Sequence, residues 1–394
     1  MAVDTHIPWY REPKKLGAVI QIAMFAAVAI VVYVMAQNAQ SNMDARGITM
    51  NTWFLDSEAP FKVGFSPFWD FRLGQTKYWE VFVIGVQNTL LVGIAGLIGA
   101  TVLGFAVGVA RLSENWFVKT FAAIFVEVFR NIPLLLQVFF WNFIVVLTAL
   151  PTVKNSIDIG GAIIINKIGI FVPAVSTTAV WPVLVYLGAF VLALVAIVTF
   201  SGWAMRRHEE TARTLPTLWI SVVIFLGLVT VAFLIAAPAT TVDFPEPTRF
   251  GFTGGFQIPI PLFSLWLALV CYTGAFIAEN VRAGIQSVQK GQREAAAALG
   301  FHQPLSMKLV QIPQALRVII PPTISQYLNL MKNSSLAVAI GYDDLVNLWM
   351  GVTLNQTGQA IVIIAMTMGV YTCISLLTSL TLNIYNKRTQ LVER

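Results

Sequence analysis

Long stretches without a charged side chain constrain this chain more than any other feature. Seven windows contain no Asp, Glu, Lys or Arg, namely 16–43, 81–110, 131–153, 168–205, 214–242, 250–278 and 345–386. An eighth window, 318–342, contains only Lys332. A helix needs about 20 mostly apolar residues to cross the hydrocarbon core of a bilayer. The runs are continuous and do not alternate in polarity, which favours helices over barrel strands.

We therefore expect an all-α integral membrane protein with eight transmembrane helices. A composition of 57% apolar and 11% charged residues agrees with this class, because an average soluble domain carries about 25% charged residues. The composition excludes an ordinary cytosolic enzyme, a disordered protein and a small disulfide scaffold. The expected spans are 17–36, 84–107, 122–148, 178–202, 217–237, 262–281, 322–345 and 358–383.

The distribution of Lys and Arg among the loops predicts the orientation. With an even number of spans both termini lie on one side, whose segments hold 16 Lys and Arg residues against 7 on the other side. Cytoplasmic loops carry the excess of positive charge, so we expect both termini and the loop 282–321 in the cytoplasm. The charges are spread over five short segments, which argues against a nucleic-acid site. The first apolar run is longer than that of a signal peptide, which favours a retained anchor helix.

Several chemistries are excluded by residue counts. Cys271 and Cys373 both fall within expected spans, so a disulfide framework is not expected. The histidines, His6, His208 and His302, lie in loops without metal-ligand spacing. The dipeptide Gly-Lys never occurs, so the chain lacks the phosphate-binding loop of many ATPases. No nucleophile stands beside a base, and we expect a protein that is not an enzyme and holds no cofactor or metal.

The loop 282–321 has an unusual local pattern. Residues 292–299 form a strong helix-forming segment rich in Ala. Gly300 stands where a residue with left-handed backbone would end that helix. Pro304 suits the first turn of a second short helix, and Pro313 is expected to help stop it. Two short helices at an angle would then project from the membrane, with a smooth alanine face that can lie in a groove of another protein.

The spacing within this loop resembles the signature of permease subunits of ABC importers. That signature reads EAA, three residues, Gly, nine residues and I-x-L-P. Here Glu294-Ala295-Ala296 is followed by Gly300 and by Val310-Gln311-Ile312-Pro313, with conservative changes at Val310 and Ile312. In the family this loop is the coupling helix that docks on the ATP-binding subunit. The resemblance implies ATPase-coupling roles for Glu294, Ala295, Ala296, Gly300 and Pro313.

Further matches run in family order from about 84 to 384. These matches resemble the polar amino-acid branch of the permeases. The matching segments are Gln87-Asn88-Thr89-Leu90, the run 128–137 around Arg130-Asn131-Ile132-Pro133, the run 272–279 leading to Arg282, and Met331-Lys332-Asn333-Ser334-Ser335-Leu336. The whole layout is similar to the larger, Q-type permease subunits of general L-amino-acid transporters. It is also similar to glutamate/glutamine/aspartate permeases, and the sequence does not separate these two groups.

The resemblance implies a domain organisation. The second, third, sixth, seventh and eighth spans match the five-helix core of a type I importer permease. Residues 1–80 add a cytoplasmic segment, an extra span and a periplasmic segment. The permease domain is expected over 84–384, with 151–261 as an insertion that carries two helices. The coupling loop is 282–321, and 385–394 form a cytoplasmic tail.

The implied function is translocation in an ATP-driven importer of L-amino acids in the bacterial inner membrane. The implied partners are a dimer of ATP-binding cassette subunits, which hold the ATP, a second and different permease subunit, a periplasmic amino-acid-binding protein and the lipid bilayer. An ion-coupled secondary amino-acid transporter is the alternative. Such transporters often show inverted repeats, and no convincing repeat relates the halves of this chain.

A few polar residues within or next to the expected spans can have either a functional or a structural role. Lys332, with Asn329, Asn333 and Ser334 beside it, is a candidate for the translocation path, because a charge inside the membrane is costly. Structural hydrogen bonding is the alternative. Glu127 with Arg130, and Glu279 with Arg282, are three residues apart and can form helical ion pairs; Glu127 and Arg130 could instead line the path. The GxxxG spacing of Gly104 and Gly108 predicts close helix packing.

Overall fold

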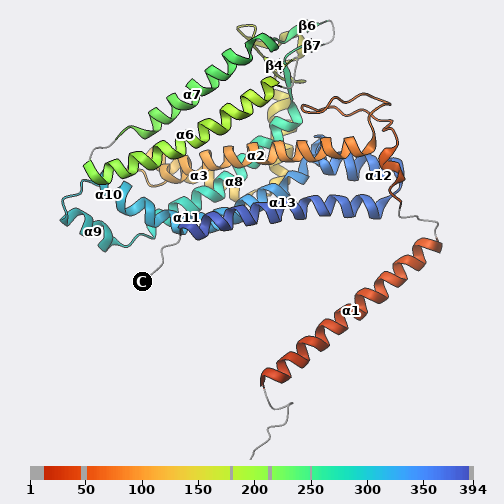
Figure 1. The fold of residues 1–394 in the computed structure, drawn as a ribbon, viewed down its shortest axis with the longest axis horizontal. Coiled ribbons are helices and arrows are strands. Elements are labelled where there is room, and N and C mark those ends of the chain that lie inside the picture. The colour runs from red at the N-terminus through yellow and green to blue at the C-terminus, as the bar shows by residue number, and fades with distance from the viewer. Residues whose placement is uncertain (1–12, 46–50, 178–180, 212–214, 249–250, 390–394) are drawn as a thin grey trace, which may run out of the picture.

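The computed structural model describes residues 13–45, 51–177, 181–211, 215–248 and 251–389, and these are mainly helical (Figure 1). The expected N-terminal segment before α1 and the end of the expected tail, 390–394, lie outside the described residues. The helices are α1 (Pro13–Ala45), α2 (Tyr78–Ala110), α3 (Trp116–Asn131), α4 (Leu134–Phe139), α5 (Leu147–Ala149), α6 (Trp181–Thr211), α7 (Thr217–Ala236), α8 (Ile260–Gln286), α9 (Lys290–Ala298), α10 (Gln303–Ser306), α11 (Ile312–Asn333), α12 (Leu354–Thr357) and α13 (Ala360–Thr389).

Within the described residues, six helices are long and apolar enough to cross a membrane. They correspond to the expected first, second, fourth, fifth, sixth and eighth spans and cover Leu16–Ala45, Tyr78–Ala110, Trp181–Ala204, Trp219–Ala239, Ile260–Gln286 and Ala360–Leu380. A seventh crossing requires that a sharply bent helix pair count as one span. The structure therefore supports a multi-pass membrane protein without confirming the count of eight.

The expected third span, 122–148, is not one continuous helix. The segments Trp116–Asn131 and Leu134–Ile144 meet at an angle of 109°. Ile132 between them has extended backbone, with φ −93° and ψ 128°, because a residue before proline avoids helical geometry. The Gln137 side chain donates to the carbonyls of Phe129 and Ile132 at 2.8 and 2.9 Å. These two bonds satisfy acceptors that the break leaves without helical donors.

The expected seventh span, 322–345, has wrong bounds. Helix α11 begins at Ile312 and ends at Asn333, where the 3-10 helix Ser334–Ile340 continues the chain. Pro321 and Pro322 thus lie inside a helix that they were expected to precede. Each proline removes the donor for the carbonyl four residues earlier. Those carbonyls belong to Arg317 and Val318, both exposed residues, which lowers the cost of leaving them free of helical bonds.

The expected insertion, 151–261, contains short strands that an all-α fold does not include. The strands are β1 (Ile157–Ile159), β2 (Ile163–Ile165), β3 (Gly169–Val172), β4 (Ala174–Thr177), β5 (Thr240–Asp243), β6 (Glu246–Thr248), β7 (Gly251–Thr253) and β8 (Phe256–Pro259). They form a four-stranded sheet in the order β1-β2-β3-β8 and the pairs β4-β5 and β6-β7, all antiparallel. Because β3 pairs with β8, the segment leaves and returns at one place, with α6 and α7 side by side between them (Figure 1).

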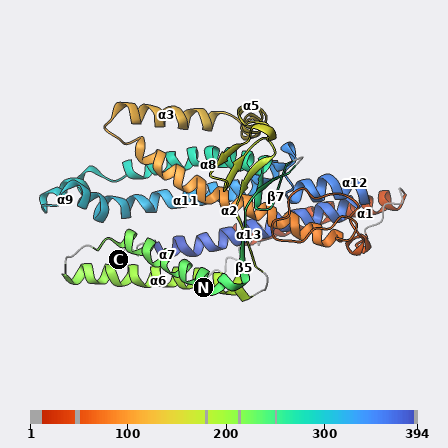
Figure 2. The ribbon, with the colours of Figure 1, turned by 90° about the horizontal axis from the view of Figure 1, so that it is seen from above.

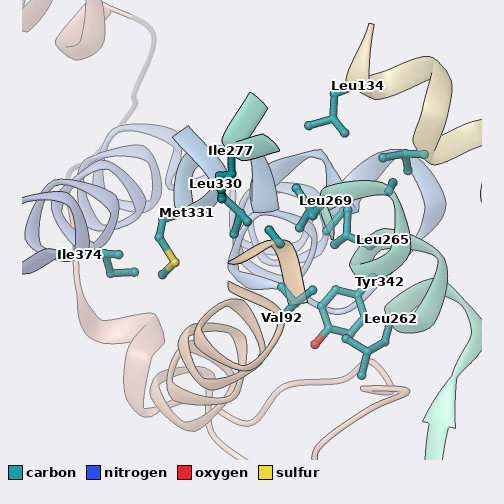
Figure 3. Close-up of a cluster of buried hydrophobic side chains, with 14 of the residues drawn as sticks. Val92, Leu134, Leu262, Leu265, Leu269, Ile277, Leu330, Met331, Tyr342 and Ile374 are labelled. Atoms are coloured by element: carbon teal, nitrogen blue, oxygen red, sulfur yellow. The ribbon is translucent and has the colours of Figure 1, made fainter. Parts of the chain in front are cut away.

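Helices α2 and α8 pack closely against each other in the core. A Cβ atom on Gly104 would lie 2.6 Å from the Ile277 Cβ, and one on Gly108 would lie 2.7 Å from that of Val281. The close packing predicted from the GxxxG spacing is therefore confirmed. Apolar side chains of α2, α8 and α11 surround this contact, including Val92, Leu265 and Leu330 (Figure 3).

We predict that Gly104→Ala destabilises the protein, because the added methyl group must displace Ile277 or the Gly274 carbonyl. Overpacking of this kind costs about 1–3 kcal/mol, and we expect a lower midpoint of thermal unfolding in detergent. The matched control is Gly227→Ala in α7, where the added Cβ meets nothing within 4 Å. An unchanged midpoint for Gly104→Ala would contradict the close α2–α8 contact.

Candidate functional site

Gly300 ends α9 as the sequence predicts. Its φ is +80°, a left-handed backbone that favours glycine. The Gly300 amide donates to the Ala297 carbonyl at 2.9 Å, and the Phe301 amide donates to that of Ala296 at 3.0 Å. These two bonds form a Schellman motif. The motif turns the chain sharply between α9 and α10 and fixes the angle at which α9 projects.

Helix α9 presents most of its alanines to the outside. Ala295, Ala297 and Ala298 are exposed, whereas Ala296 is buried. Leu299, directly after the helix, is 75% exposed. Glu294 is also exposed, and its Oε1 lies 3.5 Å from Nζ of Lys290, one turn earlier on the same helix. The result is a small-residue face with an acidic and a basic side chain at its border.

Contacts behind α9 hold it against the rest of the chain. The Gln314 side chain of α11 donates to Oε1 of Gln292 on α9 at 3.2 Å. A groove of about 710 Å³ lies between α9 and the ends of α2 and α8. Its lining includes Leu112 after α2, Gln286 of α8, Glu294 of α9 and Gln311 directly before α11.

Pro313 does not stop a second short helix. Helix α10, the π-helical segment Met307–Gln311 and α11 follow one another without a break. The Ile312 amide donates to the Met307 carbonyl, five residues back. This wider turn restarts the hydrogen-bond pattern, so Pro313 occupies the first turn of α11, where a missing N–H leaves nothing unpaired.

The four path candidates do not share one face. Lys332 and Asn329 are exposed and Asn333 is half-buried, all near the C-terminal end of α11. Ser334 is fully buried, and its hydroxyl donates to the Met331 carbonyl at 2.7 Å. The expected polar surface is therefore split, with Ser334 inside the chain and Lys332 on its surface.

Lys332 borders a cavity of about 630 Å³ next to α13. Among the described residues that line this cavity, Lys332 alone is charged. The apolar wall of the cavity comes from Val346, Met350, Met368 and Leu376. Five side chains contribute hydroxyl groups, namely Ser335, Thr367, Tyr371, Thr372 and Ser375. A cation, hydroxyls and an apolar wall together suit a small molecule that carries a carboxylate and a side chain.

Sequence reasoning missed a polar clamp around Asn88. The Asn88 side chain donates to the Phe65 carbonyl at 2.8 Å and to the Asp343 carbonyl at 2.7 Å. The Asp343 carboxylate accepts from the amides of Gly64 and Phe65 at 2.5 and 3.2 Å. The neighbouring Thr89 hydroxyl accepts from the Leu345 amide at 3.0 Å. The sequence signals were the polar pair Asn88-Thr89 inside an apolar window and the family match of Gln87-Asn88-Thr89-Leu90, and neither revealed the partners of Asn88.

One of the two expected ion pairs is present. Glu279 contacts Arg282 on the same helix, as predicted. The expected pair of Glu127 with Arg130 is wrong, because the Arg130 guanidinium lies 3.7 Å from Glu279. Glu127 instead accepts from the Asn131 side chain at 3.3 Å. Arg130 is thus drawn across to α8 by a carboxylate that already attracts other arginines.

Comparisons with known proteins agree with this arrangement. Residues 193–390 match the family model described as a binding-protein-dependent transport system inner membrane component. The matched part contains the loop 282–321 with α8, α11 and α13, whereas 84–192 of the expected permease domain lie outside it.

Relatives extend over nearly the whole chain. It is 43% identical to the putative amino-acid ABC transporter permease protein YhdX of Escherichia coli, over 98% of this chain and 97% of that one. It is 40% identical to the general L-amino acid transport system permease protein AapQ of Rhizobium johnstonii, over 97% and 94%. It is 37% identical to the glutamate/glutamine/aspartate/asparagine transport system permease protein BztB of Rhodobacter capsulatus, over 91% and 89%. The chain therefore belongs to the family of inner-membrane permease components of binding-protein-dependent transport systems.

Proposed function

We infer that this chain is a membrane-spanning translocation subunit of an ATP-driven importer of L-amino acids. The observation that carries the inference is the exposed alanine face of α9, turned outward at Gly300, in a chain that is similar over its full length to amino-acid ABC permeases. The ion-coupled secondary transporter is not favoured, because the family works with binding proteins.

Glu294, Ala295, Ala296, Gly300 and Pro313 are proposed to act in coupling. In this proposal α9 lies in a groove of an ATP-binding cassette subunit, and Gly300 and Pro313 set its direction. Closure of the ATPase dimer on ATP would move α9 and, through α8 and α11, the helices around the path. ATP stays with the partner, so this chain needs neither a cofactor nor catalytic residues of its own.

The remaining partners and the orientation are also proposals. A periplasmic binding protein would deliver the amino acid, and a second, different permease subunit would complete the path. The charge bias of 16 to 7 supports cytoplasmic termini and a cytoplasmic loop 282–321 in a bacterial inner membrane. Eight crossings would require both the bent pair around Pro133 and α11 to span. The core would then occupy 84–384, with 1–80 and 151–261 as additions.

The path is proposed to run past Lys332, with Asn329 and Asn333 nearby and Ser334 supporting the wall from inside. The cavity beside Lys332 offers a cation for a carboxylate and hydroxyls for the polar groups of a substrate. Because the cavity opens on the surface of this chain, the second permease subunit would close it.

We predict that Gly300→Val leaves membrane abundance unchanged and uncouples transport. A β-branched residue at φ +80° is strained by on the order of 1–3 kcal/mol, and relief of this strain would re-aim α9. A change of that size corresponds to a roughly 5- to 150-fold weaker attachment of the ATPase. Glu294→Lys should act similarly through charge reversal. The measurements are amino-acid uptake in a deletion strain and co-purification of the ATPase.

The matched control is Gly291→Val on the same helix, where a Cβ meets nothing and the backbone is not left-handed. Native uptake is expected for this variant. Native uptake by Gly300→Val would contradict the coupling role of α9 and favour a transporter that needs no ATPase.

We predict that Lys332→Met lowers uptake at least about tenfold, the effect of losing one charged contact with the substrate. Assembly with the partner subunits should change less than uptake does. Lys154→Met, at an exposed lysine in the insertion, serves as the control for loss of charge. If Lys332→Met transports at the native rate, the ammonium group only extends to the membrane surface and the path lies elsewhere.

A further inference from the structure

Three arginines from three helices converge on the single carboxylate of Glu279. Arg111 at the end of α2 and Arg282 on α8 contact it directly. Arg130 on α3 lies 3.7 Å away and stacks over the Phe276 ring at 5.2 Å. We call these four residues the Glu279 cluster. Three positive charges and one negative charge leave it with an excess of two positive charges.

No other carboxylate balances this excess within the described residues. No second Asp or Glu of that part lies within 4.0 Å of the three guanidinium groups. Arg130 has an Nε that is buried without a hydrogen-bond partner, and its contact with Glu279 is longer than a hydrogen bond. Since a guanidinium presents five donors, Arg130 retains unused capacity for an anion.

The cluster is open on the side of Arg130 and Arg282. Their side chains are 34% and 30% exposed, whereas that of Arg111 is 13% exposed. The Arg282 guanidinium also donates to the Gln286 side chain at 2.6 Å. A ligand could therefore reach two of the three arginines without displacing Arg111 from Glu279.

The depth of the cluster corresponds to the edge of the hydrocarbon layer. Gly108 of α2 packs against Val281 of α8, and the expected spans end near these positions, at 107 and 281. Glu279 lies two residues further in, which is about 3 Å along a helix. Headgroup phosphates lie directly outside the hydrocarbon core. In the proposed orientation this edge faces the cytoplasm. The assignment of the site to the cytoplasmic leaflet therefore rests on the proposed function.

The outer surface of α3, on the side of the helix away from Arg130, is an apolar strip. Phe121, Ile124 and Val128 of this helix are exposed. In Figure 2, α3 lies along one edge of the molecule and α6 and α7 lie along the opposite edge. This apolar surface is the side of α3 that would meet the acyl chains of the bilayer.

We propose that the Glu279 cluster binds the phosphate group of an anionic phospholipid, with Arg130 and Arg282 as its ligands. Guanidinium groups match phosphate oxygens in a bidentate geometry. Basic pockets between membrane helices on the cytoplasmic side attract anionic headgroups. Free phosphate shares this chemistry, but the position of the cluster at the edge of the hydrocarbon layer favours the lipid.

The experiment is native mass spectrometry of the purified importer complex with added phosphatidylglycerol, phosphatidylcholine or inorganic phosphate. We expect phosphatidylglycerol to be retained at collision energies that remove phosphatidylcholine. Arg130→Gln should lower phosphatidylglycerol retention at least fivefold, to the level of phosphatidylcholine. Lys119→Gln, which removes an exposed charge from the same helix, should retain the lipid as the native protein does.

Equal retention of the two lipids, or native retention by Arg130→Gln, would overturn the proposal. Inorganic phosphate that binds as tightly as the lipid with the same dependence on Arg130 would reassign the site to a free anion. If Arg130→Gln loses the second permease subunit and not the lipid, the site is a protein contact. Lipid retention is measured without transport, so the result stays interpretable even if the proposed import function is wrong. A reporter fusion after Arg207 tests the membrane orientation separately.

Discussion

The contact between α2 and α8 is the constraint on which the rest of the structure depends. Lipid tails are as apolar as leucine side chains, so helices in a bilayer gain association from close packing and not from burial alone. Gly104 and Gly108 allow this approach, because their missing side chains leave room for Ile277 and Val281. The same helix pair carries Arg111 and Glu279 at its cytoplasmic end in the proposed orientation and Asn88 toward the other end.

The close contacts extend from α8 to α11. A Cβ on Gly284 would lie 2.3 Å from Cγ1 of Ile319, so α11 approaches α8 closely directly before the chain leaves for α9. Along the chain, helix α9 therefore lies between two helices, α8 and α11, that are closely packed against each other. Rigid elements with few alternative packings transmit a displacement, because well-packed interfaces do not deform continuously. A push on α9 would thus reach α11 and, at its far end, Lys332.

Local signals in the sequence predicted the features that local chemistry controls. The length and composition of the apolar windows predicted α2, α6, α7, α8 and α13, with the ends of α7 within one residue and those of the other four within nine. Gly300 was predicted to end α9 because it stands where a left-handed residue commonly ends an alanine-rich helix. The break at Ile132-Pro133 carried the correct signal as well, but the apolar composition on both sides of it suggested one continuous span.

The features that were missed depend on contacts between distant segments. Arg130 pairs with Glu279 because α3 packs against α8, and no spacing within α3 reveals this. Pro313 and Pro321 looked like helix ends, and the wider π-helical turn before Pro313 and the exposed positions of Arg317 and Val318 have no simple sequence signature. The strands of the insertion are three or four residues long, and β8, which completes the four-stranded sheet, lies almost ninety residues after its partner β3.

The hydrogen bonds of Asn88 explain how the segment before α2 is attached to the helical core. Asn88 lies on α2, yet its side chain holds the backbone of Phe65, from the segment before α2, and of Asp343, from the turn after the 3-10 helix. The Phe65 ring also lies 6.0 Å from that of Phe256 on β8, which closes the insertion. A buried amide with two carbonyl partners resists displacement, because moving either backbone leaves a buried donor unpaired. The segment before α2 and the turn around Asp343 are therefore held by one residue of α2, and the insertion joins them through the contact between Phe65 and Phe256.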